Sequence, residues 1–195
     1  MSARAALIGA SAIYLFGASA PAHAAPGDSD QGLFYRLGVG IGYGSLGADA
    51  ALVDDQAPTL TGSLALGAKV SRTAALHATF AGSFFIDDHP FGHNETSFAT
   101  LGLGVTLWPG PFEAAGVYLS LSLGFAFSLW DSDPDGAPSH TIGFGGEIVI
   151  GKDWVVADAL RVGLGLEGVA GSGPGEYVDT QTHYGLAVVF VLSGR

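Results

Sequence analysis

The sequence predicts an all-β protein that forms a membrane-spanning, eight-stranded antiparallel up-and-down β-barrel. Eight segments alternate with period 2 between large apolar residues and small or polar ones, as strands with two different faces do. Hydrophobic residues make up 48% of the chain and charged residues only 13%, too few charges to cover a soluble domain. No segment after the N-terminal leader offers the ~20 consecutive apolar residues of a spanning helix. A closed barrel is the remaining structure that satisfies every backbone group within a bilayer.

The first 24 residues have the features of a secretory signal peptide. Arg4 precedes a largely apolar stretch from Ala5 to Ala20, and Ala22-His23-Ala24 is a small-x-small cleavage site. We therefore expect residues 1–24 to be removed, residues 25–32 to form a short polar lead-in and residues 33–195 to form the barrel. The chain has no cysteine, so we expect neither disulfides nor a lipid-anchored cysteine.

The strands follow in order from the alternation, and each is close to the 9 to 11 residues that a tilted strand needs to cross the hydrocarbon layer. The first opens the pattern, with Leu33 and Tyr35 on one face and Phe34 and Arg36 on the other. The fifth is the most regular, because seven apolar residues occupy every second position from Val117 to Leu129. The predicted strands are 33–44, 60–70, 74–84, 98–108, 117–129, 141–151, 159–169 and 182–192.

The predicted connections alternate between long and short. Long connections cover 45–59, 85–97, 130–140 and 170–181, and short ones cover 71–73, 109–116 and 152–158. Outer-membrane barrels use long external loops and short periplasmic turns, with aromatic girdles at both interfaces. An even number of strands then places both termini on the short-turn side.

These eight strands, four long loops, three short turns and signal peptide resemble the small eight-stranded outer-membrane barrels of Gram-negative bacteria, of the OmpA transmembrane domain and OmpX kind. The resemblance is architectural and includes no diagnostic motif. It implies a monomeric barrel surrounded by outer-membrane lipid, with both termini in the periplasm. Such barrels usually end on an aromatic residue that the assembly machinery recognises, whereas the last aromatic residue here is Phe190, five residues before the C-terminus.

The small face of the strands carries a few charged residues that we expect to point into the barrel. If the sixth and seventh strands pair around residue 154, Glu147 faces Arg161, and if the last two pair around residue 175, Glu167 faces His183. Because unpaired buried charge is costly, we interpret these groups as a structural network rather than a transport or catalytic site. The predicted interior charge network is Arg36, Lys69, Glu147, Arg161, Glu167 and His183.

Many inward positions are glycine, which leaves two interpretations of the lumen open. An interior lined by so little side chain could hold a narrow water-filled channel or a small-ligand cavity. Alternatively, glycine eases the curvature and large neighbours such as Tyr118 and Phe34 lie across the gap.

The four long connections are strongly acidic. They contain eleven acids and no Lys or Arg, which disfavours nucleic acid and favours divalent cations or basic partners. The acids also suit a simple solubilising role. They are Asp49, Asp54, Asp55, Asp87, Asp88, Glu95, Asp131, Asp133, Asp135, Glu176 and Asp179.

Two loop segments suggest metal ligands. Asp131, Asp133 and Asp135 precede Gly136 in the D-x-D-x-D-G pattern of a calcium loop, but the twelfth position is Ile142 rather than Glu, so we expect at most a weak calcium site or an ordinary turn. His89 and His93 share a loop with two aspartates and could ligate a transition metal, or simply be exposed. No other cofactor is expected.

The functional prediction is an integral outer-membrane barrel with a structural or surface-interaction role through its acidic external loops. The alternative is a narrow channel or small-ligand transport barrel. A lipid A-modifying enzyme is a third possibility, with Ser139, His140, His183 and Glu167 as the available residue types, but their spacing defines no nucleophile, base and orienting group. We therefore predict no catalytic residue and no enzymatic activity.

Overall fold

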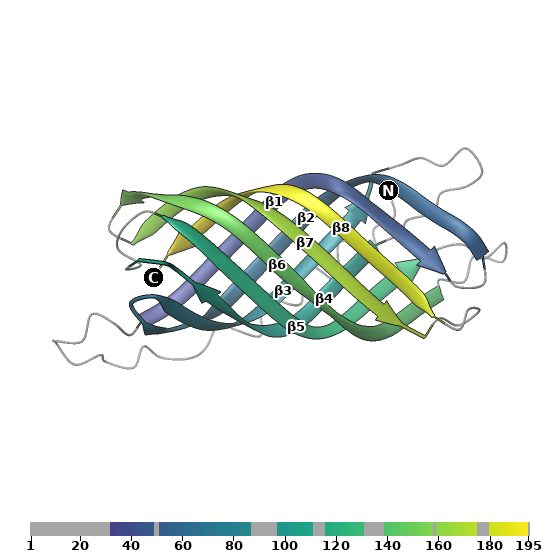
Figure 1. The fold of residues 1–195 in the computed structure, drawn as a ribbon, viewed down its shortest axis with the longest axis horizontal. Coiled ribbons are helices and arrows are strands. Elements are labelled where there is room, and N and C mark those ends of the chain that lie inside the picture. The colour runs from purple at the N-terminus through teal and green to yellow at the C-terminus, as the bar shows by residue number, and fades with distance from the viewer. Residues whose placement is uncertain are drawn as a thin grey trace, which may run out of the picture.

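Eight strands close into a barrel in which each strand pairs antiparallel with its sequence neighbours and the last pairs with the first (Figure 1). The computed structural model describes residues 32–48, 51–86, 97–110, 116–130, 139–157, 159–174 and 180–194. The strands are β1 (Gly32–Ala48), β2 (Ala51–Ser71), β3 (Ala74–Phe85), β4 (Ser97–Leu107), β5 (Val117–Trp130), β6 (Ser139–Ala157), β7 (Leu160–Gly173) and β8 (Gln181–Gly194). This architecture confirms the predicted eight-stranded up-and-down barrel.

The alternation in the sequence divides the barrel into an apolar outside and a small or polar inside. Cross-strand neighbours on one face come from the same class, as where Leu103 lies opposite Leu123. Leu103, Leu123 and Phe144 are 76 to 78% exposed on the outer wall, whereas Phe34 and Arg36 are buried inside. A wall of exposed Leu, Val, Ile and Phe is the exterior of a barrel that meets lipid.

Within the described ranges, no helix has the length and apolar character that crossing a membrane requires.

Several strands run past the predicted ends. β1 and β2 continue until Ala48 pairs with Ala51, so the expected long connection over 45–59 is mostly a hairpin extension. β6 continues through 152–157, where a short turn was expected, and β7 reaches Gly173. The alternation weakens where a strand leaves the apolar layer, because the outer face no longer needs large apolar residues, yet backbone pairing continues.

The sequence-predicted leader lies outside the described residues, which begin at Gly32, the last residue of the predicted lead-in and the first of β1.

Candidate functional site in the barrel interior

An aromatic cluster fills the short-turn end of the lumen. Phe34 of β1, Tyr118 of β5 and Trp108, which follows β4, are at most 5% exposed. The Phe34 and Trp108 rings meet edge to face with centroids 5.7 Å apart. The remaining members of the cluster are smaller: Ala65, Ala75, Val149, Ala187, Val189 and Val191.

Glycine leaves room for one of these rings. A Cβ added at Gly151 would lie 2.5 Å from the Tyr118 ring, and one added at Gly165 would lie 3.4 Å from its hydroxyl. The Tyr118 ring therefore occupies the space that two inward glycines on β6 and β7 leave empty. In this part of the lumen the geometry favours the interpretation in which large neighbours lie across the glycine-lined gap.

A charged pair crosses the lumen directly above the aromatic cluster. The Arg36 guanidinium on β1 lies 3.4 Å from the Glu147 carboxylate on β6, and these strands are not neighbours in the sheet. Ser122 on β5 donates a hydrogen bond of 3.4 Å to the same carboxylate. The guanidinium also lies 5.9 Å from the Tyr118 ring centroid and 3.5 Å from the Thr106 hydroxyl. Arg36 thus links three other strands through groups that are all buried.

A neutral polar cluster extends this network onto β3 and β4. His77 Nδ1 lies 2.7 Å from the Thr79 hydroxyl, and its Nε2 lies 3.0 Å from the Thr106 hydroxyl. Thr106 in turn donates a hydrogen bond of 3.0 Å to Ser120. These residues were not among the predicted site members. In the sequence they stand out only by lying on the small-residue face of predicted strands. Many other uncharged polar residues lie on that face, so this position does not single them out.

The remaining predicted network residues are also buried. Glu167 accepts a hydrogen bond of 2.9 Å from Ser63 across the barrel, and it lies close enough to Arg36 and Glu147 to interact electrostatically with both. Lys69 is 3% exposed. Arg161 instead forms a separate ion pair of 3.3 Å with Asp153 near the short-turn rim.

Both predicted cross-strand pairings are wrong. Glu147 lies opposite Val169 and Arg161 opposite Val155, because β6 runs to Ala157 and the β6–β7 register is centred near residue 158 instead of 154. Glu167 lies opposite Ala187, and His183 opposite Gly171. Glu147 and Glu167 therefore find their partners across the lumen. Asp153 finds its partner, Arg161, within the β6–β7 hairpin.

Among the described residues, Asp153 is a charged interior residue that the predicted network did not include. It is 1% exposed, and besides pairing with Arg161 it accepts a hydrogen bond of 3.3 Å from the Gly116 backbone amide. The predicted short turn over 152–158 concealed it. The signal was present, since Asp153 continues the inward series of Glu147, Val149 and Gly151.

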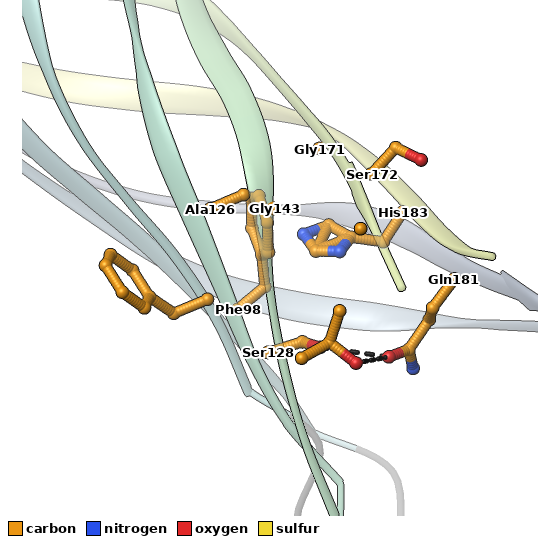
Figure 2. A pocket seen from close by; sticks show the side chains of 11 residues that line it. Phe98, Ala126, Ser128, Gly143, Gly171, Ser172, Gln181 and His183 are labelled. Carbon is orange, nitrogen blue, oxygen red and sulfur yellow. Dashed lines mark hydrogen bonds between the residues drawn. The ribbon is translucent and has the colours of Figure 1, made fainter. Parts of the chain in front are cut away.

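A second cluster of side chains lines a small pocket toward the long-loop end of the barrel (Figure 2). The Gln181 side-chain oxygen accepts hydrogen bonds from Ser128, at 3.1 Å, and Thr141, at 2.6 Å. The Phe98 ring meets the His183 ring edge to face. The pocket that these residues line leaves about 10 Å³ for the centre of a water molecule, which is room for about one water.

The predicted loop sites lie outside the described residues. This applies to the calcium ligands Asp131, Asp133 and Asp135 and to the metal ligands His89 and His93. Within the described ranges, no three His, Asp or Glu side chains come together as a metal site would require. Of the residues considered for catalysis, His183 contacts Phe98 near the start of β8, whereas Glu167 contacts Ser63 from the middle of β7.

No protein-family profile matches the chain, and no curated protein matches it significantly in sequence. Among solved structures, the chain is similar to Neisserial surface protein A, with 11% identity over 84% of this chain and 99% of that one and a TM-score of 0.62. It also matches Ail, the attachment invasion locus protein of Yersinia pestis, with 10% identity over 81% and 97% of the two chains and a TM-score of 0.44. A third match is the outer membrane protein AlkL, with 14% identity over 91% and 96% and a TM-score of 0.44. The likeness to the Neisserial protein shows the fold: the chain has the architecture of small eight-stranded outer-membrane barrels.

Proposed function

We propose that this chain is an integral outer-membrane barrel whose lumen is closed and whose acidic external loops carry its function, as a structural or surface-interaction protein. The observation that carries the proposal is the filled interior. Phe34, Trp108 and Tyr118 occupy the short-turn end, and the Arg36–Glu147 pair crosses the lumen above them.

The exposed apolar outer wall supports localisation in a membrane. Leu103 and Leu123, at mid-strand, are more than three-quarters exposed, and burying such surface in lipid is favourable by about 25 cal/mol per Å². A soluble barrel would need charges there. Tyr43, Phe84 and Tyr184, on the outer face at the long-loop end, are 54 to 58% exposed, as residues of an interfacial girdle would be.

The channel alternative rests on the polar band that includes Arg36, His77 and Glu147. Polar groups alone do not make a water path. Each of these three side chains is 2 to 4% exposed and lies within hydrogen-bonding distance of another buried polar side chain. An eight-stranded barrel has an interior just wide enough for side chains to fill. The aromatic cluster below the band fills it in this chain.

The loops are the part of the proposal that the sequence alone supports. The segments predicted as long connections hold eleven acids and no Lys or Arg, and Asp54 and Asp55 among them lie on β2. This charge favours divalent cations or basic partners over nucleic acid. Calcium titration of the folded barrel by calorimetry tests the cation part: heat in the millimolar range supports it, and its absence removes calcium from the account.

Membrane localisation and closure of the lumen are tested by separate experiments. The protein expressed with its leader is isolated from outer membranes and run unboiled and boiled on SDS gels, where a folded barrel gives a faster unboiled band. A single band, or recovery in the soluble periplasm, would overturn the membrane address.

The closed lumen is tested by single-channel recording in planar bilayers. We expect no conductance steps from the wild type, and steps from a Phe34→Ala/Tyr118→Ala variant, which serves as the control that an opened lumen is detectable. Regular steps from the wild type would favour the channel alternative instead.

A further inference from the structure

The outer wall of the barrel carries a single charged residue among the outward strand positions whose side chains are described, and that residue is Lys152. It follows Phe144, Ile148 and Ile150 along the outer face of β6 and is itself exposed. A charge on a lipid-facing wall is costly unless it reaches the interface or finds a counter-charge. Lys152 therefore needs an explanation that its apolar neighbours do not supply.

Lys152 stands beside a shallow groove of about 380 Å³ on the outer wall. In the sheet it lies between Val117 on β5 and Leu164 on β7. The groove runs over β5, β6, β7 and β8, and apart from the lysine every residue that lines it is apolar: Val117, Ile150, Gly151, Leu164, Gly165, Leu166 and Val188. The groove thus combines one ammonium group with an apolar floor.

Trp154 marks the depth of this ammonium in the membrane. It is the next outward residue on β6 toward the short-turn end, it is 43% exposed, and its ring centroid lies 5.6 Å from the Lys152 ammonium. Exposed Trp residues gather at the membrane interface. Two residues along a strand tilted by ~40° correspond to a depth of about 5 Å, a distance that a lysine side chain spans by snorkelling.

We propose that this groove binds an anionic glycerophospholipid of the periplasmic leaflet. The Lys152 ammonium pairs with the headgroup phosphate, and an acyl chain lies along Ile150, Leu166 and Val188. This proposal rests on the proposed function, which supplies the membrane and places the short-turn end in the periplasm.

Charge favours an anionic lipid over the other occupants. No acidic side chain occupies a described outward strand position, so the described outer wall itself offers no counter-charge to Lys152. A zwitterionic headgroup brings its own cation, which competes with the lysine for the phosphate. A second copy of the chain would present the same lysine and the same apolar wall, and therefore no counter-charge.

The experiment measures lipid retention by the folded barrel with native mass spectrometry. Wild type and Lys152→Gln are transferred from micelles that contain equal amounts of phosphatidylglycerol and phosphatidylcholine. We expect the wild type to retain one phosphatidylglycerol in preference, and Lys152→Gln to reduce that retention about fivefold, the effect of one basic residue near an anionic lipid surface.

Two further variants separate the headgroup contact from the groove. Arg72→Gln removes a cation from the exposed β2–β3 turn, away from the groove, and should retain phosphatidylglycerol as the wild type does. Leu166→Trp fills the groove and should lower retention of both lipids while Lys152 remains.

Equal retention by wild type and Lys152→Gln, or no preference for phosphatidylglycerol in the wild type, would overturn the proposal. A dimer that Lys152→Gln dissociates would replace it with an interface between two copies. Each sample is also run unboiled and boiled on a gel. Loss of the heat-modifiable band in the wild type would contradict the proposed function itself, whereas normal bands with unchanged lipid retention contradict only the lipid site.

Discussion

Replacing Leu123 by arginine tests the nature of the solvent around the barrel. Leu123 is 78% exposed on β5, so its replacement removes little packing inside the protein. In water, a substitution at such a position changes the free energy of unfolding by about 0.5 kcal/mol or less. In a bilayer the same change places a guanidinium among acyl chains.

The cost in a bilayer follows from the position of the residue along its strand. Leu123 is six residues after Val117, the first residue of β5. At ~3.3 Å per residue and a tilt of ~40°, it lies about 15 Å above the short-turn end of the strand, close to the middle of an apolar band ~25 Å tall. Arginine at the midplane of a barrel costs about 2–4 kcal/mol, and near the interface about 0–1 kcal/mol.

The assay is urea unfolding of the barrel folded into phosphatidylcholine vesicles, followed by the heat-modifiable band and by tryptophan fluorescence. We expect Leu123→Arg to lower the free energy of unfolding by about 3 kcal/mol. Leu33→Arg is the control, since Leu33 is 64% exposed but lies at the start of β1, near the interface, and should cost at most about 1 kcal/mol. If Leu123→Arg unfolds within 0.5 kcal/mol of the wild type, roughly the spread for exposed sites in water, this wall does not face lipid.

Three further substitutions test the interior, each measured by thermal unfolding of the micelle-bound barrel. Glu147→Ala leaves the buried Arg36 guanidinium without its ion pair and should lower the free energy of unfolding by about 3 kcal/mol, or the Tm by ~6–12 °C. Glu147→Gln should cost less. An unchanged Tm for Glu147→Ala would mean that the pair does not stabilise the barrel. Gly151→Ala should lower the free energy of unfolding by about 1–3 kcal/mol, because the added methyl group collides with the Tyr118 ring. Gly110→Ala is the control and should change stability little, because its methyl group meets nothing within 4 Å. Equal Tm values for the two variants would contradict the packing of the Tyr118 ring. Phe34→Ala empties the centre of the aromatic cluster and should cost about 3–5 kcal/mol, and a loss below 1 kcal/mol would mean that the cluster does not hold the strands together.

Much of the fold was predictable because it depends on a local property. A strand between lipid and a narrow lumen has a different solvent on each face, so its residues alternate, and alternation is visible in a few neighbouring positions. Strand number, antiparallel order and the inward direction of Arg36, Glu147 and Glu167 follow from that pattern. The strand ends were less predictable, since the pattern disappears outside the apolar layer while pairing continues to Ala48 and Ala157.

The sequence by itself therefore determined the barrel, its apolar wall, the identity of most inward charges and the acidity of the long loops. Only the tertiary structure decided which inward groups meet. Arg36 and Glu147 are 111 positions apart on strands that do not pair, and their contact depends on the register of every hairpin between them and on the closure of β1 against β8. The same registers place Asp153 inside the barrel and Lys152 outside it, in a segment where the sequence predicted a turn. The two-residue period of a strand determines the face on which a residue lies. No local pattern encodes how eight staggered strands align across a lumen.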